Sequence, residues 1–94
     1  MATLTPAEIE ERLASAGEWQ RGDGQTIVRE LRFPDFAAAI AFVNRVAELA
    51  EQANHHPDIL VHGWNKVRLS LSTHSEGGLT DADFRLASSI EGLL

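Results

Sequence analysis

The sequence predicts an α+β fold in two layers: a four-stranded antiparallel sheet with helices packed on one face, in the order α-β-β-α-β-β-α. Three observations lead to it. The central stretch "FAAAIAFVNRVAELAEQA" has helical periodicity, the flanking stretches "TIVRELRF" and "KVRLSLST" alternate every two residues, and helix caps stand near both ends. A chain of 94 residues fits a single domain, 1–94.

Composition excludes several classes of function. The net charge of −6 and the scattered basic residues argue against binding nucleic acid, which needs clustered Lys and Arg. No apolar run approaches the roughly 18 residues of a membrane span, and the chain opens without a leader pattern, so we expect a cytoplasmic protein. The absence of cysteine removes a disulfide framework and a thiol nucleophile.

The first helix is predicted at "TPAEIEERLA". Thr5 can cap it, Pro6 suits the first helical position, and Glu8 completes a capping box. Ile9 begins its apolar side, and Gly17 ends it. A hairpin follows, with Trp19 on its first arm, a turn at 22–25 and a strand at 26–33.

The central helix is expected to begin after Asp35, its N-cap, and to end near His55, because Pro57 disfavours helical geometry before it. Two sets of apolar residues recur along it at helical spacing. The first set predicts the buried stripe and the second widens it: Phe36, Ile40, Val43, Ala47 and Ala50, then Phe42, Val46 and Leu49.

Two strands and a helix complete the chain. The strands are expected at 59–62 and 66–73, with a turn at 63–65 between them and a loop at 74–78 after them. Thr80 caps the last helix, with Asp81 and Asp83 in its first turn, where the helix dipole favours carboxylates. Its predicted apolar face is Ala82, Leu86 and Ile90.

The adjacent histidines His55 and His56 are the strongest chemical signal. They stand at a helix C-terminus, where partial negative charge favours protonated imidazole, and Glu51 is four residues before His55, on the same helical face. Such a histidine suits proton donation near neutral pH, but it also suits a purely structural role as a partner of the dipole. His74, at a strand end, is either a binding group or a surface residue, and His62 is expected to be unremarkable.

Other site chemistries find weaker support. A zinc site stays open, because His55, His56 and His74 could meet a carboxylate, although no metal motif is present. "GDGQTI" is not a dinucleotide fingerprint, and no GxSxG nucleophile motif occurs. Trp19 and Trp64 suit a core or an interface, and Trp19 could alternatively form a flat wall against a ligand ring.

The segments "EQANHHP", "WNKVRLSLSTH" and "GLTDADFRLA" together resemble the pterin-4a-carbinolamine dehydratase family, and the resemblance runs from about Trp19 to the last helix. The matching positions are Glu51, His55, His56, Pro57, Trp64, His74 and Asp83. The resemblance implies the fold predicted above, homodimers or homotetramers, and dehydration of a 4a-hydroxytetrahydropterin to quinonoid dihydropterin. It implies no metal and no organic cofactor. The pterin would be that of an aromatic amino-acid hydroxylase.

The resemblance also implies roles for single residues. His55 and His74 would donate protons to the leaving hydroxyl, His56 would bind substrate or act as base, and Glu51 would orient His55. Trp19 would line the pterin pocket.

The remaining candidates contact substrate or support a histidine. The backbone of Ser72 and Thr73 would bind the pterin edge, and Asp83 would hold His74 or cap its own helix. Asn54 belongs to the same group, with an amide where other members have Asp, and Gly63 is an extra residue relative to the common pattern. The alternative function is a non-catalytic module that binds pterin or acts as a dimerisation cofactor of a transcription factor.

Overall fold

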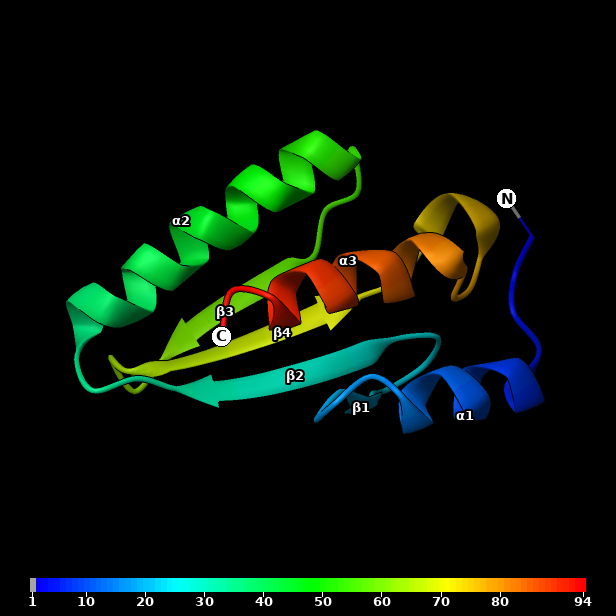
Figure 1. Ribbon diagram of the computed structural model, residues 1–94, viewed down its shortest axis with the longest axis horizontal. Helices are drawn as coiled ribbons and strands as arrows, with labels where there is room; N and C mark the ends of the chain where they lie inside the picture. The colour runs from blue at the N-terminus through cyan, green and yellow to red at the C-terminus, as the bar shows by residue number, and fades with distance from the viewer. Residues whose placement is uncertain (1) are drawn as a thin grey trace.

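The structure is a computed structural model that describes residues 2–94 (Figure 1). Its elements follow the predicted order, with a short 3₁₀ turn before the last helix. They are α1 (Pro6–Ala14), β1 (Gln20–Arg21), β2 (Ile27–Arg32), α2 (Phe36–Ala53), β3 (Asp58–His62), β4 (Lys66–Leu71), η1 (His74–Glu76) and α3 (Asp81–Glu91). The sheet has four strands in the order β1-β2-β4-β3, and each neighbouring pair is antiparallel. The predicted fold class is confirmed.

The helices cover one face of the sheet (Figure 1). Alternate residues of β2 and β4 point toward them, and Ile27, Val67 and Leu69 are fully buried there. A single apolar cluster joins these strands to Ile9 of α1, to α2 and to α3. The other face carries exposed residues such as Arg68, which explains the strict alternation in β4.

The predicted helix starts are confirmed by hydrogen bonds. Thr5 and Glu8 form a reciprocal capping box at α1. The Asp35 carboxylate accepts from the Ala38 N–H at 2.7 Å at the start of α2. At α3 the hydroxyl of Thr80 and the carboxylate of Asp83 form a second capping box. These side chains satisfy N–H groups that a helix start leaves unpaired, so each helix begins where a capping residue stands.

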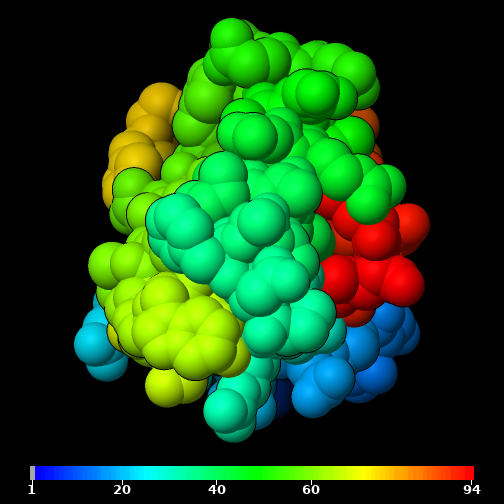
Figure 2. All heavy atoms as spheres, turned by 90° about the vertical axis from the view of Figure 1, so that its left-hand side faces the viewer, coloured from blue at the N-terminus to red at the C-terminus, as the bar shows by residue number. Residues whose placement is uncertain are grey.

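The buried face of α2 lies to one side of the predicted stripe. Phe42, Val46 and Ala50 face the core as predicted, and Ala39 joins them. Phe36, the first residue of the predicted stripe, is instead 55% exposed. The helix is apolar on more than one side, so spacing alone did not choose the side that meets the sheet. Figure 2 shows the start of α2 beside the β3–β4 turn at one end of the molecule.

The buried face of α3 also differs from the predicted one. Leu86 and Ile90 are buried as expected, but Asp83, Phe84 and Ala87 are buried with them and Ala82 is only half-buried. A polar residue thus lies on the core-facing side of α3, which binary apolar patterning does not reveal. Among residues 2–94, no helix is long and apolar enough to cross a membrane.

Candidate functional site

The end of α2 sets the positions of the double histidine. The helix ends at Ala53, and Asn54 adopts a left-handed conformation with φ of 50°. The Asn54 N–H donates to the carbonyls of Ala50 and Glu51, and the His55 N–H donates back to Ala50 at 3.1 Å. Asn tolerates this conformation better than most residues, so the helix stops here and the chain turns sharply. His55 and His56 therefore lie beyond the helix.

This turn changes the partner of Glu51. The predicted contact between Glu51 and His55 assumed that both residues were helical, and that assumption is wrong. Glu51 instead contacts His56, with 2.5 Å between its Oε2 and Nε2 of the imidazole. Both side chains are largely exposed, at 75% and 58%, so solvent screens this pair and it contributes little to stability.

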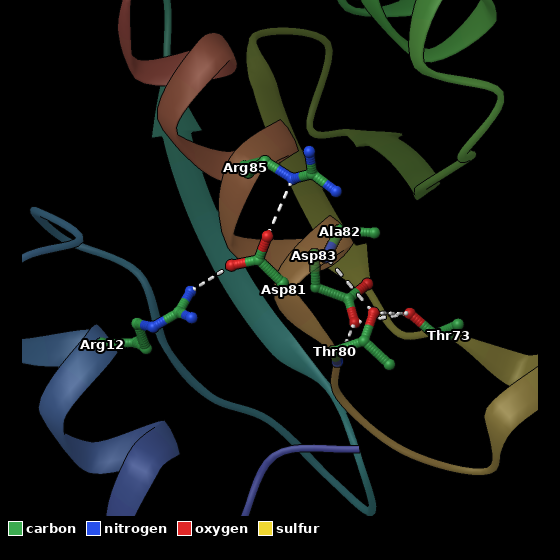
Figure 3. A network of polar contacts seen from close by, with 7 residues as sticks. All are labelled: Arg12, Thr73, Thr80, Asp81, Ala82, Asp83 and Arg85. Carbon is green, nitrogen blue, oxygen red and sulfur yellow. Dashed lines mark hydrogen bonds and ion pairs between the residues drawn. The ribbon is translucent and has the colours of Figure 1, made fainter. Parts of the chain in front are cut away.

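Asp83 is the partner of His55. Its Oδ1 lies 2.6 Å from Nε2 of the imidazole, and the carboxylate is fully buried at 0% exposure. Its Oδ2 accepts from the Thr73 hydroxyl at 2.8 Å and from the Thr80 N–H at 2.9 Å. Figure 3 shows Thr73 and Thr80 converging on this carboxylate. Asp83 thus caps its own helix, as one alternative predicted, and it holds His55, where the other alternative named His74.

The geometry assigns the proton between these two groups. An ionised carboxylate only accepts hydrogen bonds, so Nε2 of His55 carries the hydrogen in this contact. The other ring nitrogen, Nδ1, makes no hydrogen bond with residues 2–94 and can serve a ligand. A buried charge needs compensation, and here it comes from the imidazole, two further donors and the N-terminal dipole of α3.

His74 follows β4, after Ser72 and Thr73. It begins the 3₁₀ turn η1 and is exposed, while Thr73 before it is buried beside Asp83. The Thr73 backbone forms a bridge with Gly78, donating at 3.1 Å and accepting at 3.4 Å. Asp83 therefore connects the segment that carries His55 with the segment that carries His74.

The structure does not bring all the predicted residues to this point. Trp19 is 3% exposed and belongs to the core, so its indole is not an open wall within this chain. Its Nε1 is buried and has no hydrogen-bond partner among the described residues. Ser72 is half-buried after β4, and Asn54 is exposed at the end of α2. Trp64 is 61% exposed in the β3–β4 turn.

Sequence reasoning missed the Thr80 hydroxyl as part of the site. Thr80 was predicted only to cap α3, and Thr73 only to offer backbone groups. The available signal was the Thr-x-x-Asp spacing of a capping box, which places Asp83 beside the Thr80 hydroxyl. That spacing did not reveal that Thr73 would join them from another element.

Cavities give a weaker indication than the side-chain chemistry. One hollow, of about 360 Å³, lies between α1 and α3, and none of the histidines lines it. A second, of about 340 Å³, lies between the end of α2 and α3 and includes His55 in its wall.

Among residues 2–94, no group of three or more His, Asp and Glu side chains is placed to hold a metal ion. The zinc alternative therefore has no ligand set in this part of the chain.

Comparison with known proteins agrees with the resemblance. The family model described as "Pterin 4 alpha carbinolamine dehydratase" matches residues 2–93. A relative from Acidobacterium capsulatum, named as a pterin-4-alpha-carbinolamine dehydratase, is 57% identical over 100% of both chains. One of the same name from Chloroflexus aggregans is 51% identical over 100% of this chain and 99% of its own.

Solved structures show the same fold. A transcriptional coactivator/pterin dehydratase from Brucella melitensis superposes with a TM-score of 0.91, at 35% identity over 97% of each chain. A pterin dehydratase-like RuBisCO assembly factor of the α-carboxysome reaches 0.67, at 25% identity over 80% of this chain and 87% of its own. The family match over nearly all the chain and these identities establish that the chain belongs to the pterin 4 alpha carbinolamine dehydratase family.

Proposed function

We propose that this protein dehydrates a 4a-hydroxytetrahydropterin to quinonoid dihydropterin and water, in the recycling of a pterin cofactor. The observation that carries the proposal is the contact of 2.6 Å between His55 and the fully buried carboxylate of Asp83. A second histidine, His56, directly follows His55 in the chain. A fixed imidazole with one free nitrogen is suited to moving a proton. Family membership supplies the substrate class.

The reaction requires two proton movements. The C4a–O bond breaks as the 4a-hydroxyl takes a proton and leaves as water. The N5–H bond breaks as its electron pair forms the C4a=N5 double bond, and that proton goes to a base. General acid and base groups typically contribute about 10²–10⁴-fold to such steps, and no redox step or nucleophile is needed.

The two carboxylate–histidine pairs suggest different roles. His55 is proposed as a proton donor, because the buried Asp83 holds its Nε2 in place and leaves Nδ1 for the leaving hydroxyl. His74 is the second proposed donor, at the end of β4. His56 is proposed as substrate binder and base, with exposed Glu51 accepting from its Nε2 and leaving Nδ1 available.

The test is dehydration of the 4a-carbinolamine, generated as both hydroxyl stereoisomers, by the wild type and by His55→Ala, His56→Ala and His74→Ala. His62→Ala is the matched control, since His62 is exposed on β3 and outside the site. We expect each of the three site variants to lose about 10²-fold in rate, and the control to keep it. Equal rates for all four variants would remove the histidines from the mechanism.

A second candidate, self-association, is favoured by exposed apolar residues. Phe36, Leu60 and Trp64 are 55%, 53% and 61% exposed, and β3 is an edge strand of the sheet. We infer a homodimer or homotetramer that covers some of these residues, and the alternative is a protein partner. Light scattering should give a mass above the monomer that Leu60→Ser lowers. A strict monomer at high concentration would leave the protein partner as the remaining reading.

A further inference from the structure

A cluster of buried hydroxyls lies behind the His55–Asp83 contact. Thr80 and Asp83 are 0% exposed and Thr73 is 9% exposed. The Thr73 and Thr80 oxygens are 2.8 Å apart, and Thr73 also lies 2.8 Å from Oδ2 of Asp83 (Figure 3). Asp81, two residues earlier, instead binds the guanidinium groups of Arg12 and Arg85. Figure 3 shows the two carboxylates serving separate networks.

Counting donors fixes the direction of each hydrogen bond in the cluster. A hydroxyl has one proton, and that of Thr73 goes to the Asp83 carboxylate, which has none to give. In its contact with Thr80, Thr73 must therefore accept, and the Thr80 hydroxyl donates. The Thr80 oxygen in turn accepts from the Ala82 N–H at 3.3 Å. The two hydroxyl groups thus form a chain of hydrogen bonds, in which Thr80 donates to Thr73 and Thr73 donates to Asp83.

These hydrogen bonds occupy Oδ2 of Asp83 and leave its Oδ1 for His55. Oδ2 already accepts from the Thr73 hydroxyl and the Thr80 N–H, so rotation of the carboxylate would break two buried hydrogen bonds. Successive hydroxyl donors polarise one another, which strengthens the last bond of the chain. Oδ1 consequently stays aimed at Nε2 of His55.

We propose that the hydroxyls of Thr73 and Thr80 are positioning groups, which act through Asp83 to fix the tautomer and aim of His55. Thr73 directly precedes His74, so the same cluster also ties the end of β4 to His55. The inference rests on the proposed dehydratase function for its effect on turnover. Its effect on the His55 ring is independent of that function.

The test compares Thr73→Val, which keeps the shape and removes the hydroxyl, with Thr73→Ser, which keeps the hydroxyl. Thr26→Val is the matched control, because the Thr26 hydroxyl donates only to the Asp23 carbonyl in an exposed turn. We expect Thr73→Val to lower kcat about 10- to 100-fold, with KM within about twofold. Thr73→Ser should return kcat to within about threefold of the wild type.

Ring ¹⁵N chemical shifts of His55, at a pH where the ring is neutral, give the second readout. The wild type should show a protonated Nε2 and an unprotonated Nδ1, and Thr73→Val should move both signals toward the average of two tautomers. A Thr73→Val protein with wild-type kcat and wild-type shifts overturns the proposal. Lost activity with unchanged shifts and no rescue by Thr73→Ser also overturns it, because the role is then only structural.

Two outcomes separate this inference from the proposed function. If the wild type has no dehydratase activity but Thr73→Val still shifts the His55 signals, the proposed function fails and the positioning chain stands. If Thr73→Val does not fold, hydroxyl proton exchange in the wild type tests the proposed chain of hydrogen bonds instead. Its buried Thr73 and Thr80 hydroxyl protons should exchange slowly enough to be observed by NMR, and fast-exchanging hydroxyls would contradict the chain.

Discussion

Replacement of Asp83 by Asn changes the chemistry of the site with little change in shape. The Thr73 hydroxyl and the Thr80 N–H both need an acceptor at Oδ2, so the amide oxygen should take that position. The NH₂ group then faces His55 where Oδ1 stood. Because NH₂ donates, Nε2 of His55 must present its lone pair, and the proton moves to Nδ1. The tautomer of His55 is reversed.

The size of the effect follows from the three hydrogen bonds that Asp83 accepts. Bonds to a charged group contribute about 1.5–3 kcal/mol and neutral bonds about 1 kcal/mol, so weakening three bonds removes about 1.5–6 kcal/mol of unfolding free energy before any compensation. Release of the buried charge offsets part of this loss. We expect Asp83→Asn to lose about 1–2 kcal/mol, whereas Asp83→Ala should lose about 3–5 kcal/mol.

Urea unfolding measures the stability terms, and carbinolamine turnover measures the chemistry. Asp83→Asn should fold and yet lose about 10²–10⁴-fold in kcat, because an NH₂ group that donates to Nε2 cannot balance the charge of an imidazolium that acts through Nδ1. An Asn variant that keeps activity within about threefold would refute the orienting role of Asp83. An Asn variant as unstable as the Ala variant would refute the hydrogen-bond assignment.

Three further predictions concern the fold. Leu69→Ala should lower the free energy of unfolding by about 2–5 kcal/mol in urea, because Leu69 is fully buried; Glu10→Ala, on an exposed residue of α1, should change it by at most about 0.5 kcal/mol. Asn54→Ala should lower the melting temperature, since Asn54 has φ of 50° and Asn tolerates that conformation better than Ala; an unchanged or higher melting temperature contradicts this. The backbone N–H and hydroxyl of Thr5 lower the pKa of Glu8 below 4.5. Stability from Glu8 is therefore present above pH 4.5 and lost as pH falls through the lowered pKa, and Glu8→Gln should weaken acid destabilisation of α1 followed by NMR.

The helix starts and the sheet were predictable because local chemistry determines them. Thr5, Asp35 and Thr80 cap the helices that follow them, and the alternation of "KVRLSL" matches one buried and one exposed face of β4. The pairing of β2 with β4, across α2 and β3, was not predicted, whereas the hairpin pairs β1–β2 and β3–β4 follow from short connections. These features depend on neighbours within a few residues.

Long-range packing explains what was missed. The orientation of α2 depends on which of its apolar sides meets the sheet, and Phe36 and Val46 look equally suitable in the sequence. Glu51 contacts His56 rather than His55, because the left-handed conformation of Asn54 ends the helix and turns the chain. The contact of His55 with Asp83 joins residues 28 positions apart, which no local pattern predicts. The histidines and Asp83 were identified, but their pairing required the structure.

The most direct measurement is the rate of 4a-carbinolamine dehydration by the purified wild type, against buffer alone and against the combined variant His55→Ala, His56→Ala and His74→Ala. General acid–base catalysis predicts an acceleration of about 10²–10⁴-fold that the combined variant loses while it stays folded. A folded wild type that turns over substrate no faster than buffer would contradict the proposed dehydratase.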